Sequence, residues 1–146
     1  MNTSLKTILA LLGLLVLIVF FVNRLEASPS IPAECTGVYA NEITQTSSYP
    51  DYIRGTNGND IIRVTTTGNY INARGGNDCI ILTTYGNSVA AGSGNDVVVA
   101  TEGGQYIQGG TGADVLLGVG NDYINGNGGN DTCTTGVNGY LRSCEN

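Results

Sequence analysis

Apolar residues recur at a spacing of nine along most of the chain, and a polar residue stands two places before each of them. The spacing shortens by one residue once, between Asp114 and Asp122. The apolar positions are Ile62, Ile71, Ile80, Val89, Val98, Ile107, Leu116, Ile124 and Cys133. A helix with 3.6 residues per turn does not produce a period of nine with glycine-rich breaks. The pattern predicts very short strands joined by tight turns.

Two such strands would complete one coil, so residues eighteen apart would stack at the spacing of neighbouring strands, about 4.8 Å. One inward apolar side chain per strand makes a thin core, and no isolated repeat would be stable. The missing residue between Asp114 and Asp122 should shorten one turn. The fold class we expect is all-β: a parallel β-roll, which is a β-solenoid of nine-residue half-coils.

Every second turn is rich in glycine and ends in an aspartate. These turns read GTNGND, ARGGND, AGSGND, GGTGAD and GNGGND, and they end at Asp60, Asp78, Asp96, Asp114 and Asp131. Two unit charges stacked about 4.8 Å apart repel by about 3.5 kcal/mol if the effective dielectric is about 20. Several such gaps rival the whole stability of a small domain, about 5 to 15 kcal/mol. No Lys or Arg recurs at the repeat interval, so the column predicts a bound cation. Ca²⁺ fits because it takes carboxylate and carbonyl oxygens.

The alternate turns carry no such charge. They read TTTGN, TTYGN and TEGGQ and end in Asn69, Asn87 and Gln105. We therefore expect calcium along one edge of the roll and an uncharged ladder of amides and threonines along the other. Asp122 lies in the shortened turn GVGND, where calcium binding is not expected. The competing interpretation of the aspartates is a metal-free solenoid in which each one bonds its own backbone two residues on.

The aspartate turns resemble the RTX, or haemolysin-type, calcium-binding repeats, whose nonapeptide is GGxGxDxUx with U a large apolar residue. The resemblance extends from Gly55 to about Cys133 and includes five turns in register. It implies a right-handed parallel β-roll in which each Ca²⁺ lies between consecutive glycine turns on one side. Five turns leave four gaps, and hence room for at most four ions.

Carried over by position, the resemblance implies three groups of calcium ligands. The first is the five aspartate carboxylates. The second is backbone carbonyls around Gly55, Gly58, Gly75, Gly76, Gly92, Gly94, Gly109, Gly110, Gly112, Gly126, Gly128 and Gly129. The third is the asparagines that precede the first three aspartates, namely Asn59, Asn77 and Asn95. Ala73 and Ala91 replace glycine at the first position of the motif.

The N-terminal part of the chain is typical of an exported protein. Residues 7–22 are free of charge, and this run of sixteen falls between a signal h-region, roughly 7 to 15 residues, and a full span of about 20. Residues 1–27 are therefore a signal peptide or an N-terminal membrane anchor. We expect an irregular N-terminal cap segment over 28–54, the calcium-binding β-roll over 55–133 and a C-terminal cap over 134–146.

Four cysteines lie beyond the leader and predict two disulfide bonds. Strand alternation predicts an outward apolar patch on the strands after the aspartate turns, made by Ile61, Cys79, Ile81, Val97, Val99, Val115 and Leu117. Such a patch usually means a covering segment or a partner. Our hypothesis is that residues 35–53 fold across it, tied down by a Cys35–Cys79 bond, and that a Cys133–Cys144 bond closes the C-terminal cap. On the opposite sheet, tyrosines 70, 106 and 123 predict cross-strand packing, with a sugar-binding strip as the alternative.

Composition narrows the function. The chain has 12 acidic and 6 basic residues, which argues against nucleic acid as a partner. It has no His, and no Cys or Ser stands beside an obvious activating residue, so we assign no catalytic residue and expect no enzyme. The prediction is an exported calcium-binding protein, folded by calcium, with a structural or adhesive role at or outside the cell surface. The alternative is a metal-independent solenoid that binds a surface glycan or a protein partner.

Overall fold

The computed structural model describes residues 32–35, 37–45 and 50–145, so the expected leader over residues 1–27 lies outside the described part. No helix within that part is long and apolar enough to cross a membrane. The described residues form twelve strands. These are β1 (Asn41–Gln45), β2 (Tyr52–Arg54), β3 (Asp60–Val64), β4 (Tyr70–Asn72), β5 (Cys79–Leu82), β6 (Ser88–Ser93), β7 (Val97–Ala100), β8 (Tyr106–Thr111), β9 (Val115–Leu117), β10 (Tyr123–Gly128), β11 (Thr132–Thr134) and β12 (Tyr140–Arg142).

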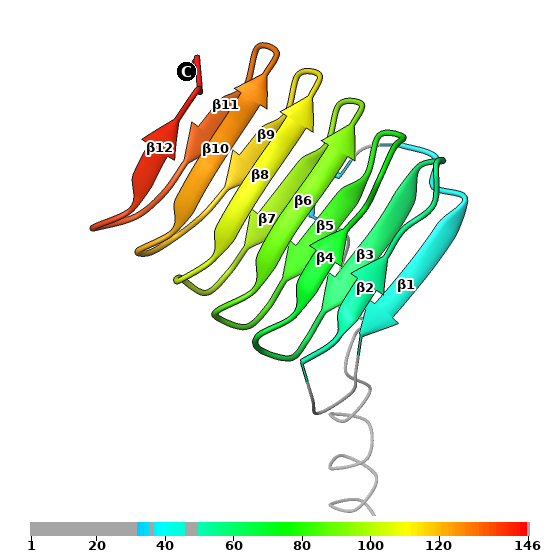
Figure 1. Cartoon of the computed structure of the whole chain (residues 1–146), viewed down its shortest axis with the longest axis horizontal. Coiled ribbons are helices and arrows are strands. Elements are labelled where there is room, and N and C mark those ends of the chain that lie inside the picture. Colours follow the sequence, from blue (N-terminus) through cyan, green and yellow to red (C-terminus); the bar gives the residue numbers. More distant parts are fainter. Residues whose placement is uncertain (1–31, 36, 46–49, 146) are drawn as a thin grey trace, which may run out of the picture. The chain divides into compact units, whose positions relative to one another are not determined.

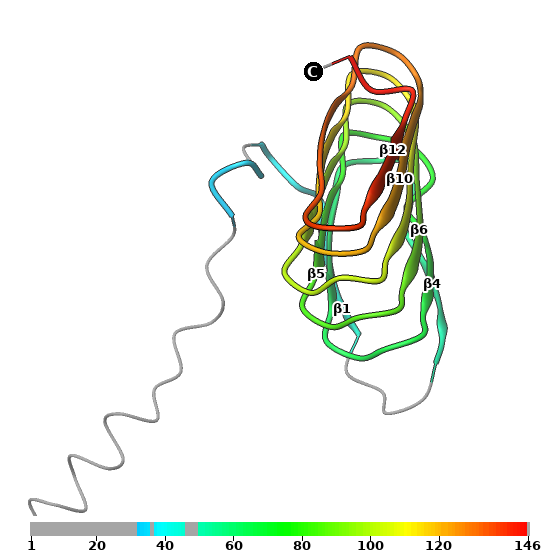
Figure 2. The ribbon, with the colours of Figure 1, turned by 90° about the vertical axis from the view of Figure 1, so that its left-hand side faces the viewer.

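The strands alternate between two parallel sheets. Sheet A has the order β1-β3-β5-β7-β9-β11, and sheet B has the order β12-β10-β8-β6-β4-β2. Figure 1 shows the strands of each sheet side by side, and Figure 2 shows successive coils as flattened loops stacked on one another. The predicted fold class, an all-β parallel β-roll, is confirmed.

The register of the sheets follows the repeat in the sequence. Val97 pairs with Val115 across sheet A, an offset of 18 residues. Tyr106 pairs with Tyr123 across sheet B, an offset of 17. The missing residue therefore falls in the turn between β9 and β10, within the interval where the sequence predicted a shortened turn.

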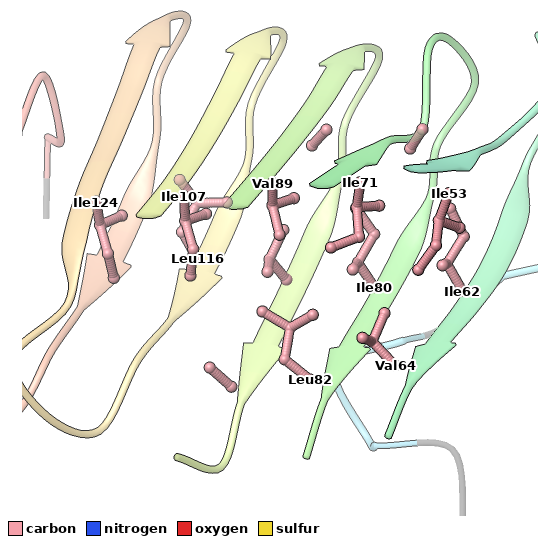
Figure 3. Packing of buried hydrophobic residues seen from close by; sticks show 14 of the residues in the cluster. Ile53, Ile62, Val64, Ile71, Ile80, Leu82, Val89, Ile107, Leu116 and Ile124 are labelled. Atoms are coloured by element: carbon pink, nitrogen blue, oxygen red, sulfur yellow. The ribbon is translucent and has the colours of Figure 1, made fainter. Parts of the chain in front are cut away.

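A single column of apolar side chains from each sheet forms the core. All nine positions of the predicted apolar repeat are at most 1% exposed. Figure 3 shows side chains of this cluster meeting in the space between the two sheets. Val64 and Leu82 join the same cluster and widen it beyond the single predicted residue per strand, while Ile53 extends the column to β2, where it pairs with Ile71.

The N-terminal segment differs from our expectation in two respects. It is not irregular, because it contains β1 and β2, and β1 pairs with β3 at the edge of sheet A. Only the part next to Cys35 covers the apolar patch: Cys35, Ile61, Cys79 and Ile81 form a small cluster against which Tyr39 packs. Unpaired N–H and C=O groups at a sheet edge favour an added strand, which explains why β1 extends the sheet instead of crossing it.

Other residues expected in the cover lie elsewhere. Val38 is 87% exposed, Tyr52 stands on the outside of sheet B at 54% exposure, and Ile43 packs against the main core. Tyr49 lies outside the described residues. The cover therefore leaves Val99, Val115 and Leu117 partly exposed.

Two disulfide bonds join Cys35 to Cys79 and Cys133 to Cys144, which are the pairs that we proposed from the sequence. On sheet B, tyrosine rings stack across neighbouring strands. Tyr52 lies on Tyr70 with ring centroids 5.2 Å apart, and Tyr123 lies between Tyr106 and Tyr140 at 4.9 and 5.3 Å. These stacks support cross-strand packing for the tyrosines.

Candidate metal centre

The strands of sheet A bring the five predicted aspartates into one column. Asp60 is the first residue of β3, and each of the others directly precedes the first residue of β5, β7, β9 or β11. The residues that follow them pair with one another along the sheet. We call this column the aspartate edge, and its members are each at most 1% exposed: Asp60, Asp78, Asp96, Asp114 and Asp131.

One oxygen of four of these carboxylates accepts a backbone N–H from the preceding coil. The backbone N–H of Asp60 donates to Oδ1 of Asp78 at 2.8 Å, and that of Asp78 donates to Oδ1 of Asp96 at 2.8 Å. The bonds from Asp96 to Asp114 and from Asp114 to Asp131 repeat this arrangement at 2.9 Å. These bonds cross to the neighbouring coil, unlike the turn geometry in which an aspartate bonds its own backbone two residues on.

The second oxygen of four aspartates has no partner. Among the described residues, five buried side-chain nitrogen or oxygen atoms lack a hydrogen bond. One is Nη1 of Arg63, and the other four are the Oδ2 atoms of Asp78, Asp96, Asp114 and Asp131. A buried carboxylate oxygen without a donor costs at least 1 to 3 kcal/mol and more when it is charged, so the column needs a further positive or donating group.

Burial raises the pKa of three carboxyl groups in the aspartate edge. It raises the pKa of Asp78 and of Asp96 to about 7, and that of Asp114 to about 6. Loss of hydration is the largest cause, and the charge of a neighbouring aspartate adds to it, while the hydrogen bond from the adjacent coil lowers the pKa. The ionised carboxylates are therefore disfavoured unless a cation lies near them.

The glycine turns place backbone carbonyls against the next coil. Gly94 and Gly112 have φ angles of 125° and 127°, which favour glycine. A Cβ atom at Gly94 would collide with the carbonyl oxygen of Gly76, and one at Gly112 would collide with that of Gly94. The close approach continues from Gly58 to Gly129, so the five glycines predicted at this position form one row.

Carbonyl and carboxylate oxygens also meet between coils. A Cβ atom at Gly109 would collide with Oδ2 of Asp114 and would lie 2.8 Å from the carbonyl oxygen of Gly126 in the following coil. The free oxygen of Asp114 therefore faces the gap toward that coil. Ala73 and Ala91 occupy the corresponding position in the turns of Asp78 and Asp96.

These oxygen ligands suit calcium better than they suit a metal that is held by side chains alone. No group of three His, Cys, Asp or Glu side chains within the described residues could hold a metal ion. An ion here would need backbone carbonyls to complete its coordination. Ca²⁺ accepts such mixed sets of six to eight oxygens, whereas zinc prefers Cys and His.

Asp60 differs from the other members of the aspartate edge. Its Oδ2 accepts hydrogen bonds from the backbone N–H of Thr56 at 2.6 Å and from the Thr56 hydroxyl at 3.1 Å. Its Oδ1 accepts a bond from Nδ2 of Asn41 at 2.7 Å. Neutral donors therefore satisfy this carboxylate, and the first of the four predicted gaps lacks a free carboxylate oxygen.

The asparagines predicted as ligands form a ladder of their own. Oδ1 of Asn59 accepts the backbone N–H of Asn77, Oδ1 of Asn77 accepts that of Asn95, and Oδ1 of Asn95 accepts that of Ala113, each at 2.8 Å. Asn77 and Asn95 are exposed. The three side chains thus tie the outer rims of the turns together and do not join the buried carboxylates.

The opposite edge contains the same ladder, with neutral side chains in three of its four members. We call the column of Asn69, Asn87, Gln105 and Asp122 the amide edge. Backbone N–H groups of Asn69, Asn87 and Gln105 donate to the side-chain oxygen of the next member at 2.8 to 3.0 Å. The amide nitrogens of Asn69 and Asn87 donate to the carbonyl oxygens of Thr66 and Thr84 at 2.7 and 3.0 Å.

Asp122 shows how a charge is accommodated at the amide edge. Its Oδ2 accepts the backbone N–H groups of Val119 and Gly120 at 3.0 and 3.2 Å. The shortened turn between β9 and β10 therefore supplies two donors to this carboxylate. This arrangement is consistent with our expectation that calcium does not bind there.

Three polar residues next to the aspartate edge were missed by the sequence analysis. Thr56 had a detectable signal, because it is the only Ser or Thr at the second position of the five aspartate turns. Asn41 and Glu145 had none, since both lie outside the repeat. Glu145 accepts the backbone N–H of Asp131 through Oε2 at 2.8 Å.

Comparison with known proteins gives one match. The family model of the RTX calcium-binding nonapeptide repeat, in four copies, matches residues 54–84, 90–120 and 118–137. These ranges include all five members of the aspartate edge and more than half of the 146 residues. No curated protein and no solved structure gives a significant match.

Proposed function

Because this chain belongs to the family of the RTX calcium-binding nonapeptide repeat, we propose that it is an exported calcium-dependent β-roll with a structural or adhesive role at or outside the cell surface. The family implies calcium binding and the β-roll. The two disulfide bonds support export, since such bonds persist in oxidising compartments. We assign the protein no catalytic role.

One observation carries this proposal: buried aspartate oxygens without a partner stand in register along one edge of the roll. We place calcium in the gaps that follow Asp78, Asp96 and Asp114, where the free Oδ2 atoms lie. The ligands in each gap are that carboxylate and backbone carbonyls of the adjoining glycine turns, including Gly76, Gly94 and Gly112. The ion supplies the positive charge that the column lacks.

We remove two groups of residues from our initial set of calcium ligands. Asp60 is satisfied by Thr56 and Asn41, so the first gap needs no ion. The side chains of Asn59, Asn77 and Asn95 support the turns from outside. Our initial upper limit of four ions in the four aspartate gaps thus becomes three.

Calcium binding is coupled to folding in this proposal. Without the ion, the stacked carboxylates either repel one another or must take up protons, and both effects oppose the folded roll at neutral pH. Extracellular calcium modules bind with dissociation constants of roughly 0.1 to 1 mM. The roll would therefore be stably ordered outside the cell and only marginally stable where calcium is scarce.

Far-ultraviolet circular dichroism of the full chain tests the coupling. The protein would be kept in a mild detergent because residues 7–22 are apolar. We expect the strand signal to strengthen and the melting temperature to rise when millimolar Ca²⁺ replaces chelator, and the same concentration of Mg²⁺ to give little change, since Mg²⁺ demands a tighter octahedral site. Identical spectra and identical melting curves in chelator and in calcium would overturn the proposal.

A further inference from the structure

The roll continues past its last aspartate turn. Asp131 is 1% exposed, and its Oδ2 atom has no hydrogen-bond partner. In the inner coils, such an oxygen faces the gap toward the next aspartate turn. No sixth aspartate turn follows Asp131 in the sequence, yet the residues next to this oxygen reproduce one.

The backbone of Glu145 makes the coil-to-coil bond of an inner strand. Its N–H donates to the carbonyl oxygen of Asp131 at 2.8 Å. In the inner coils, the N–H groups of Val97, Val115 and Thr132 make the equivalent bond at 2.8 Å. Their acceptors are the carbonyl oxygens of the aspartates one coil earlier, namely Asp78, Asp96 and Asp114. The three donor residues directly follow an aspartate in the motif, so Glu145 stands one place beyond the position of an aspartate.

The side chain of Glu145 makes the bond of the missing aspartate. Its Oε2 accepts the backbone N–H of Asp131 at 2.8 Å. In the inner coils, Oδ1 of the next aspartate accepts this N–H, as Asp131 does from Asp114 at 2.9 Å. Because the backbone of Glu145 lies one residue further along, the longer glutamate side chain is needed to reach back.

The carbonyl of Ser143 takes the place of a glycine carbonyl. A Cβ atom at Gly126 would collide with both Oδ2 of Asp131 and the carbonyl oxygen of Ser143. At Gly109, one coil earlier, the corresponding pair is Oδ2 of Asp114 and the carbonyl oxygen of Gly126. A carboxylate oxygen and a carbonyl oxygen thus converge in the terminal gap as they do in an inner one.

A disulfide bond fixes this segment. Cys144 stands between Ser143 and Glu145 and is bonded to Cys133 in β11. Three consecutive residues therefore supply the contacts of an aspartate turn without its glycine loop.

We propose that residues 143–145 and Asp131 form a terminal calcium site, which the repeat motif does not include. Its protein ligands are the carboxylates of Asp131 and Glu145 and the carbonyl oxygen of Ser143, and water completes the coordination because Glu145 is exposed. This inference rests on the proposed function. It raises the expected number of ions from three to four.

Native mass spectrometry of the full chain, with calorimetric titration, counts the ions. Glu145→Gln keeps a hydrogen-bond acceptor but removes the charge, and Glu145→Asp keeps the charge but shortens the reach. Both variants should bind one Ca²⁺ fewer than the unaltered protein, and the remaining sites should keep their affinities. Glu102→Gln is the matched control, because it removes one exposed negative charge near the amide edge, and it should bind the full number.

The outcomes separate the two proposals. If both Glu145 variants retain the full number of ions while the unaltered protein binds calcium, the terminal site is wrong and the proposed function stands. If Glu145→Asp retains the ion that Glu145→Gln loses, the geometric argument about reach is wrong. If the unaltered protein binds no calcium, the proposed function and the terminal site both fail.

Discussion

The two edges of the roll share one backbone ladder and differ in how the second polar atom of each side chain is satisfied. At both edges, a side-chain oxygen accepts the backbone N–H of the preceding coil at 2.8 to 3.0 Å. At the amide edge, the second atom of Asn69 and of Asn87 is an N–H₂ group that donates to carbonyls of its own turn. At the aspartate edge, the corresponding atom is an oxygen that has no donor in four of the five coils.

The difference separates the part of the fold that stands alone from the part that needs a ligand. A buried ladder is complete when every polar atom has a partner, and the amide edge meets that condition with protein atoms. The aspartate edge could meet it with asparagines, so the extra negative charge has to serve something other than the ladder. A cation between the coils is the group that this charge accommodates.

The most severe test converts one edge into the other. The triple variant Asp78→Asn, Asp96→Asn and Asp114→Asn should fold in chelator and keep only the calcium response of the terminal site. Each occupied site at a concentration 100 times its dissociation constant contributes about 2.7 kcal/mol, and this stabilisation should vanish with the ions. Thermal melts in chelator and in calcium measure it. A triple variant that gains as much stability from calcium as the unaltered protein would show that these three carboxylates are not ligands.

The reverse conversion should have a smaller effect. Asn87→Asp places a buried charge on the amide edge and removes the donor to Thr84. We expect a loss of about 2 to 4 kcal/mol in the free energy of unfolding. Calcium should not restore it, because the turn TTYGN lacks the glycine carbonyls of the aspartate edge. Denaturant unfolding in calcium checks this, and full recovery would mean that any stacked aspartate binds the ion.

Two single Asp→Asn substitutions should change the free energy of unfolding in opposite directions in chelator at pH 7.5. Asp122→Asn should destabilise the protein by about 1 to 3 kcal/mol, because an amide nitrogen replaces the oxygen that accepts two N–H groups. Asp96→Asn should stabilise it, because the variant loses a buried charge without losing the ladder bond. Denaturant unfolding of the two variants and of the unaltered protein measures both changes. Equal destabilisation would contradict the distinction between the edges.

Lowering the pH should stabilise the calcium-free protein through the aspartate edge, and this is the smallest of the expected effects. The pKa values of Asp78 and Asp96 are about 7 in the folded protein, above the ordinary 3.8. The folded state then binds more protons than the unfolded state between about pH 4 and 7, so its stability falls as pH rises through that interval. In chelator we expect a melting temperature about 5 °C higher at pH 5 than at pH 7.5. The triple asparagine variant is the control and should lack this difference, and a melting temperature that rises with pH in chelator would refute the expectation.

The features that follow from the nine-residue repeat could be predicted from the sequence alone. Its period of nine located the nine buried apolar residues, the aspartate column, the neutral edge and the shortened turn before Asp122, because each depends on residues one or two half-coils apart. It also separated the two edges, since only one of them carries stacked charge. These features follow from local spacing and from the distance between neighbouring strands.

Features outside the repeat could not be predicted in this way. The pairing of β1 with β3 depends on an open sheet edge, which no pattern in Asn41–Gln45 reveals. The role of Asn59, Asn77 and Asn95 depends on which side of the turn each side chain faces, and the motif alone does not fix that. Glu145 lies 14 residues after Asp131, so its place in the ladder results from the path of the C-terminal segment.

A crystal structure of the protein grown in calcium tests the central claim most directly. Anomalous scattering identifies the ions, and the distances to the Oδ2 atoms of Asp78, Asp96 and Asp114 establish the ligands. We predict one ion in each gap that follows these residues, at about 2.3 to 2.6 Å from the carboxylate oxygen, and none along the amide edge. Density for water alone beside these three oxygens at saturating calcium would contradict the account.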